Sequence, residues 1–148
     1  MKGKRILIAI DGSSGSSEAL ETGLALARAA DAIATLVYVR RRPRKLDRFY
    51  QCTLIEELVW ARAVVAEAEA RAAETGVESE SEILEGHPAG RIVELAQARG
   101  ADLIVIGSHG RGAVAGALVG SVSTEIVHKA DRPVLIAKQR SRARRVAA

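Results

Sequence analysis

Glycine and serine residues gather in two short segments whose chemistry suits a phosphate group. One is Asp11–Ser13, and the other is Gly107–Gly112, which continues to Gly120 and Ser121. Glycines lack a Cβ atom and so allow backbone N–H groups to approach an anion closely. A helix that begins at Ser121 would add unpaired amides and the positive end of its dipole. The second segment therefore predicts an anion site, with a tight structural turn as the alternative.

Other nucleotide and catalytic motifs are missing from the sequence. No Gly-x4-Gly-Lys-Ser/Thr segment is present, and no Gly-x-Gly-x-x-Gly follows the first apolar run, which argues against a P-loop NTPase and a dinucleotide site. His109 has no acid or nucleophile beside it in a recognisable arrangement, and no nucleophile-elbow sequence supports a Ser-His-Asp triad. We therefore predict no catalytic residue.

Alternating strand and helix patterns must position these segments. Short aliphatic runs such as Ile6–Ile10 are typical of parallel strands buried on both faces. The expected strands span residues 5–10, 33–39, 77–84, 101–106 and 133–137, and the expected helices span residues 16–30 and 53–75, with further helices after residues 86 and 120. This alternation predicts a three-layer α/β sandwich. The turns after the first and fourth strands would then meet at the carboxyl edge of the sheet.

Length and composition fit one globular domain. The chain has 148 residues, of which 48% are hydrophobic, and a single cysteine, Cys52, that cannot form an internal disulfide. The first apolar run is too short for a signal peptide or a membrane span. We expect a cytoplasmic protein without membrane insertion, with one domain over residues 1–138 and a basic, disordered tail over residues 139–148.

Basic residues are concentrated in two places. The net charge is +4, and clusters of Arg and Lys occupy residues 40–48 and the chain from Lys138 onward. Aromatic residues make up only 3% of the chain, so stacking platforms for bases are absent and nucleic-acid binding is not expected. The segment Arg40–Arg48 is predicted to be a solvated loop, with contact to phosphate or to an acidic partner as the alternative.

The glycine spacing resembles that of a known family. Gly107, Gly110, Gly120 and Ser121 form the pattern Gly-x2-Gly-x9-Gly-Ser, and the neighbouring segments Ile8–Ser13 and Arg132–Ile136 fit the same family in order. With these segments, the chain resembles the ATP-binding branch of the universal stress proteins over about residues 4 to 138. The resemblance implies a Rossmann-like open parallel sheet in the order 3-2-1-4-5, of the adenine nucleotide alpha hydrolase type.

The resemblance also implies a set of ligand contacts. Asp11 would hold the ribose, although a role in capping the first helix is the alternative, and Val39 would present backbone groups to adenine. Tyr38 departs from the His that family members often carry before this position. Magnesium or manganese would accompany the phosphates, although no cluster of acids has ligand spacing. His109 and Arg111 would stand at the rim of the site. The remaining residues expected to bind the nucleotide, mainly at the ribose and phosphates, are Gly107, Ser108, Gly110, Gly120, Ser121, Val122 and Ser123.

The resemblance implies an ATP-binding stress regulator, in which we expect ATP to order the Gly107–Gly120 loop and to change a surface that an unknown protein partner recognises. The exposed apolar edge strand Pro133–Ala137 implies a homodimer. A weak ATPase or phosphotransfer enzyme is one alternative. A dimeric interaction module without nucleotide, or one that takes AMP or cyclic AMP, is the other.

Overall fold

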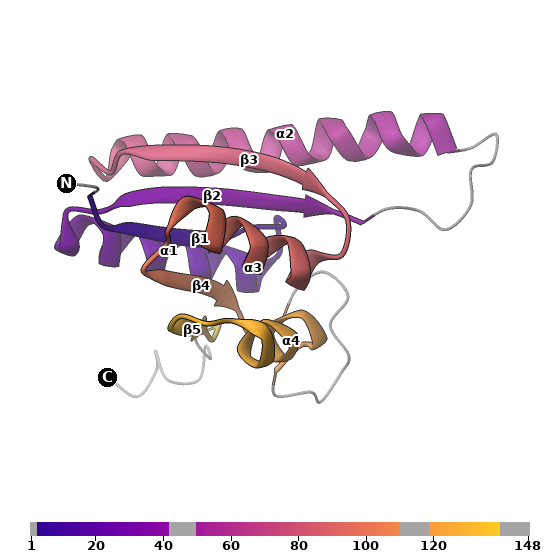
Figure 1. The fold of residues 1–148 in the computed structure, drawn as a ribbon. Coiled ribbons are helices and arrows are strands. Elements are labelled where there is room, and N and C mark those ends of the chain that lie inside the picture. The colour runs from indigo at the N-terminus through magenta and orange to yellow at the C-terminus, as the bar shows by residue number, and fades with distance from the viewer. Residues whose placement is uncertain (1–2, 42–49, 110–118, 140–148) are drawn as a thin grey trace, which may run out of the picture.

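The computed structural model of the chain describes residues 3–41, 50–109 and 119–139, with the backbone alone for residues 50–52. Within these ranges, five parallel strands form one open sheet in the order β3-β2-β1-β4-β5 (Figure 1). The strands are β1 Arg5–Ala9, β2 Ile33–Arg40, β3 Ser79–Glu85, β4 Leu103–Gly107 and β5 Val134–Ala137. The predicted α/β sandwich and its strand order are confirmed. The order reverses between β1 and β4, which is where sheets of this kind place a ligand.

Helices cover both faces of the sheet. They are α1 Ser14–Ala30 and α2 Tyr50–Glu74 on one face, and α3 Pro88–Arg99 and α4 Ser121–Lys129 on the other (Figure 1). Each face has its own apolar cluster, in which Ile8 and Leu24 are buried on the first side and Leu7 and Ile126 on the second. In the described ranges, no helix combines the length and the apolar character that a bilayer crossing requires.

The ends of the elements differ from the predicted ones by a few residues. Helix α1 begins at Ser14 and not at Ser16, because Ser13 is its N-cap and the Ser13 hydroxyl accepts a hydrogen bond from the Ser16 amide at 3.2 Å. Helix α2 begins at Tyr50, earlier than the predicted Thr53. Strand boundaries shift in the same way, since hydrogen bonding decides the terminal residues.

Arg40 corrects one prediction, because it is the last residue of β2 and not part of a solvated loop. The residue is 6% exposed, and its guanidinium donates to Glu85 Oε2 at 2.7 Å. Glu85 is the partner of Arg40 in the register between β2 and β3, so the strand brings the neutralising carboxylate with it. The rest of the predicted basic loop, residues 42–48, and residues 140–148 of the predicted tail lie outside the described residues.

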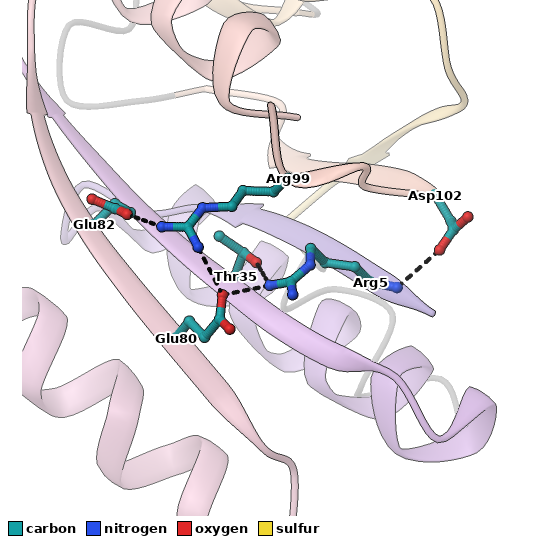
Figure 2. A network of polar contacts seen from close by, with 6 residues as sticks. All are labelled: Arg5, Thr35, Glu80, Glu82, Arg99 and Asp102. Atoms are coloured by element: carbon teal, nitrogen blue, oxygen red, sulfur yellow. Dashed lines mark hydrogen bonds and ion pairs between the residues drawn. The ribbon is translucent and has the colours of Figure 1, made fainter. Parts of the chain in front are cut away.

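A polar network joins the amino-terminal ends of the strands (Figure 2). The Arg5 guanidinium donates to Thr35 Oγ1 at 3.0 Å and to Glu80 Oε2 at 2.5 Å, and so links three neighbouring strands. The Arg5 amide donates to Asp102 Oδ2 at 2.9 Å, and Arg99 at the end of α3 lies 3.5 Å from the same Glu80 oxygen. Thr35 is fully buried, and its hydroxyl has a charged donor there.

Candidate functional site

A cavity of about 540 Å³ lies at the carboxyl ends of the strands, where the strand order reverses. This volume is within the range of small-molecule sites. The residues around it come from the ends of β1, β2 and β4, from the start of α4, and from α2 and α3. The predicted site residues that line the cavity are Asp11, Val39, Gly107, His109, Gly120, Ser121, Val122 and Ser123.

The first turn of α4 supplies unpaired hydrogen-bond donors to this cavity. Gly120 is the N-cap and has no side chain to cap the helix. In the described ranges, the amides of Ser121, Val122 and Ser123 donate to no partner, and all three residues line the cavity. Orphan amides and the positive end of the helix dipole attract an anion. The predicted helix start at Ser121 is therefore confirmed, and it faces the cavity.

Close packing explains the glycine at the end of β4. A Cβ atom on Gly107 would lie 2.5 Å from the backbone carbonyl group of Gly15 in α1, so only glycine lets the two segments approach this closely. Gly107 is not among the described glycines with positive φ. The Ser123 hydroxyl donates to Gly107 O at 2.8 Å and ties α4 to the same strand end. Gly107 thus helps to shape the cavity through the backbone contact it permits.

The neighbouring Ser108 lies in the junction between strands and helix. Its amide donates to Ala137 O of β5 at 3.0 Å, and its carbonyl accepts from the Gly120 amide at 2.6 Å. Ser108 is buried and is not one of the described residues that line the cavity. The Gly120 amide is therefore used within the fold. Gly110 and Arg111 of the predicted site lie outside the described residues.

The turn after β1 presents Asp11 to the cavity. The Asp11 carboxylate accepts from the Ser13 amide at 2.9 Å, and the Asp11 amide donates to Ser16 Oγ at 3.0 Å. Gly12 adopts a φ of 84°, and Trp60 of α2 lies against it while its indole N–H donates to Asp11 O at 3.4 Å. Because Ser13 is the N-cap of α1, the alternative that Asp11 caps this helix is wrong. Its carboxylate instead forms part of the cavity wall.

The wall on the α3 and α4 side is apolar. Val39, near the end of β2, lines the cavity on this side. A flat, weakly polar group such as a nucleobase would bury its faces on such a surface. The apolar residues on this wall are Ala9, Val37, Val39, Pro88, Ile92, Ile106 and Val122.

His109 and a nearby ion pair add polar groups around the cavity. His109 lines it, and the ring nitrogen Nε2 is buried with no hydrogen-bond partner in the part of the chain that is described. His87, the N-cap of α3, contacts the carboxylate of Glu125 on α4 and so joins the two helices beside the cavity. The hydrogen bond from His87 is the main cause that lowers the pKa of Glu125 below its usual value.

Sequence reasoning did not identify two charged residues that line the cavity, Glu57 of α2 and Arg41, which follows β2. Glu57 lies 3.6 Å from the Arg40 guanidinium. Nothing in the sequence separates Glu57 from the other glutamates of this long helix, since its role depends on how α2 is docked. Among the described residues, no group of three or more His, Cys, Asp or Glu side chains gathers in a way that could hold a metal ion.

Fold and site place the chain among doubly wound α/β proteins with a ligand cavity at the reversal of strand order. The chain belongs to the universal stress protein family, whose family model matches residues 3–138. A universal stress protein of Thermus aquaticus is 38% identical over 138 residues, which cover 91% of this chain and 98% of the relative. The predicted membership of this family is confirmed.

Solved structures of the family agree with this assignment. The universal stress protein MJ0577 of Methanocaldococcus jannaschii is similar with a TM-score of 0.86 at 26% identity, over 95% of this chain and 99% of that chain. A universal stress protein solved in complex with cAMP has a TM-score of 0.71 at 26% identity, over 95% of this chain and 100% of its own. The architecture of the sheet and its helices is thus that of the family.

Proposed function

We propose that this chain binds ATP in the cavity at the carboxyl ends of the strands and acts as a nucleotide-responsive stress regulator. The observation that carries the proposal is the set of amides at the start of α4, from Ser121 to Ser123, which have no partner among the described residues and stand beside a cavity with an apolar wall. These amides suit a polyphosphate, because a helix N-terminus attracts anions even where no P-loop lysine is present. Asp11 suits a ribose, and the Val39 backbone suits the edge of adenine.

Regulation follows from differential binding. A nucleotide that binds only one arrangement of the cavity walls favours that arrangement, and a partner protein can read the resulting surface. We propose a regulator and not an enzyme: His109 and Arg41 line the cavity, but no described residue is assigned the role of base or arginine finger toward a phosphate. Magnesium or manganese would enter with the phosphates, since the described side chains supply no cluster of ligands of their own.

The choice of adenine nucleotide is part of the proposal. A family member solved in complex with cAMP makes cyclic AMP the second candidate ligand, and AMP is a third.

We further propose a homodimer that pairs through the exposed edge of β5, Val134–Ala137. The single cysteine of the sequence favours a cytoplasmic location. A domain that ends near residue 138, before a separate basic tail, remains a prediction.

Substitution of Ser121 offers a direct test of the amide donors. Proline is well tolerated at the first position of a helix, and Gly120 has the extended conformation, with ψ of 165°, that a residue before proline prefers. Ser121→Pro therefore removes one amide donor and leaves α4 intact. Ser121→Ala is the matched control, because it removes the hydroxyl alone.

ATP affinity would be measured by titration calorimetry, with Trp60 fluorescence as a second signal, since this single tryptophan lies against the Asp11–Gly12 turn. We expect Ser121→Pro to weaken ATP binding about tenfold, as for a hydrogen bond to a charged group, and Ser121→Ala to change it little. Equal affinities for Ser121→Pro and the wild type would contradict the site.

Thermal unfolding separates the alternatives. ATP at a hundred times its Kd should stabilise the native state by about 2.7 kcal/mol. An unchanged Tm with millimolar ATP, AMP and cAMP would instead favour an interaction module without nucleotide. Steady phosphate release from ATP, lost in Ser121→Pro, would favour the weak ATPase.

A further inference from the structure

Helix α2 adds a second carboxylate to the cavity wall, and the buried Arg40 forms an ion pair with it without a hydrogen bond. Glu57 lines the cavity and lies 3.6 Å from Arg40, whose side chain is 7% exposed. Arg40 also pairs with Glu85, so its charge is neutralised from two sides. One helical turn along α2, Trp60 contacts the Asp11–Gly12 turn. These two contacts fix the part of α2 that presents Glu57.

Charges are distributed unevenly around the cavity. Among the described residues that line it, the acids are Asp11 and Glu57, which both stand on the side of β1, β2 and α2. The opposite end, at α4, carries the unpaired amides and no carboxylate from a described residue. Two carboxylates repel a phosphate, although Arg41, which also lines the cavity, offsets part of this charge. The phosphates of a nucleotide therefore belong at α4.

The remaining parts of the ligand follow from this orientation. The apolar wall on the α3 side suits the base, and the ribose connects the base to the phosphates. The base then occupies the α3 side and the phosphates occupy the α4 end. The hydroxyl edge of the ribose therefore faces the remaining wall, which carries Asp11 and Glu57. Ribose hydroxyls donate hydrogen bonds, and an ionised carboxylate accepts them strongly.

We propose, on the basis of the proposed nucleotide function, that Glu57 accepts a hydrogen bond from the ribose hydroxyls beside Asp11. Glu57 thereby selects nucleotides with a free 2′,3′-diol and disfavours those with a phosphate on the ribose. Arg40 is a positioning residue, because it touches Glu57 and not the cavity. The selection against ribose phosphates follows from repulsion between like charges at short range.

The test uses three ligands that differ only at the ribose: AMP, 2′,3′-dideoxy-AMP and adenosine 3′,5′-bisphosphate. Their affinities for the wild type, Glu57→Gln and Glu56→Gln would be measured by titration calorimetry. Glu56 is the matched control, because it is the adjacent glutamate of the same helix, is exposed and does not line the cavity. Thermal unfolding of each variant without ligand checks that the fold is retained.

We expect Glu57→Gln to weaken AMP binding about fivefold to tenfold, to leave dideoxy-AMP unchanged and to tighten the bisphosphate. Glu56→Gln should bind all three ligands as the wild type does. An equal loss for AMP and dideoxy-AMP, or no loss for AMP, would overturn the role of Glu57 while the nucleotide site stands. A wild-type protein that binds neither these three ligands nor ATP removes both proposals.

Discussion

At the amino ends of the strands, Arg5 and Arg99 both contact Glu80, and Arg5 also donates to the buried hydroxyl of Thr35 (Figure 2). At the carboxyl ends, the amides that open α4 face a cavity and have no partner within the described ranges. Both ends belong to one sheet and contain charged side chains. The difference is that one end meets its hydrogen-bonding needs internally and the other leaves donors for a ligand.

This comparison separates polar groups that stabilise from polar groups that bind. Buried polar groups normally find partners within the protein, and a group without one costs free energy. The amino-end network follows this rule, since the buried Thr35 hydroxyl accepts from Arg5. The carboxyl end departs from it at His109, whose buried Nε2 has no partner in the described part of the chain, and it also presents the first amides of α4 at the cavity. Function is therefore expected at the carboxyl end.

The largest effect should come from the contact that holds the carboxyl end together. Gly107→Val places a Cβ 2.5 Å from the Gly15 backbone, and we expect it to destabilise the protein by about 3 kcal/mol or more and to abolish nucleotide binding. Urea unfolding measures the loss. Gly3→Val is the control, since nothing lies within 4 Å of a Cβ at Gly3. A stable Gly107→Val protein would contradict the close packing.

A substitution at the amino end should affect stability and leave binding unchanged. Arg5→Met leaves the Thr35 hydroxyl without its charged donor, and we expect a loss of about 2 kcal/mol in the free energy of unfolding. ATP affinity should stay at its wild-type value. Thr35→Val in the Arg5→Met background should recover part of the stability, because the stranded hydroxyl is then removed. A parallel loss of affinity would mean that the two ends are coupled.

The opposite result is expected for Asp11. Asp11→Asn keeps an oxygen that accepts from the Ser13 amide and removes the charge from the cavity wall. Because a charged acceptor is stronger than a neutral one, we expect ATP affinity to fall about fivefold and the urea midpoint to stay constant. Unaltered ATP binding, measured by calorimetry, would exclude the ribose contact.

The smallest effect concerns the exposed pair of His87 and Glu125 beside the cavity. The hydrogen bond from His87 lowers the pKa of Glu125, so this carboxylate contributes stability above its ordinary value of 4.5 and loses it as the pH falls below that value. A carbon-detected NMR titration should find the pKa of Glu125 below 4.5 in the wild type and near it in His87→Ala. The same pKa in both proteins would rule out the pairing.

Local signals in the sequence predicted much of the fold and part of the site. Short aliphatic runs such as Ile6–Ile10 identified the buried strands, because a strand covered on both faces needs apolar residues throughout. Gly120 and Ser121 identified a helix start after the glycine-rich segment, since that start depends on local chain geometry. Neither signal could show that Arg40 is buried, because its neutralising Glu85 comes from a strand far along the chain.

By itself, the sequence determined the alternation of strands and helices, the family and the segments that face the carboxyl edge of the sheet. These depend on residue type and on spacing along the chain. Only the tertiary structure decided that Gly107 packs on Gly15, that Ser13 and not Asp11 caps α1, and that Glu57 reaches the cavity. Each of these depends on distances between segments that are separate in sequence, which periodicity and composition do not encode.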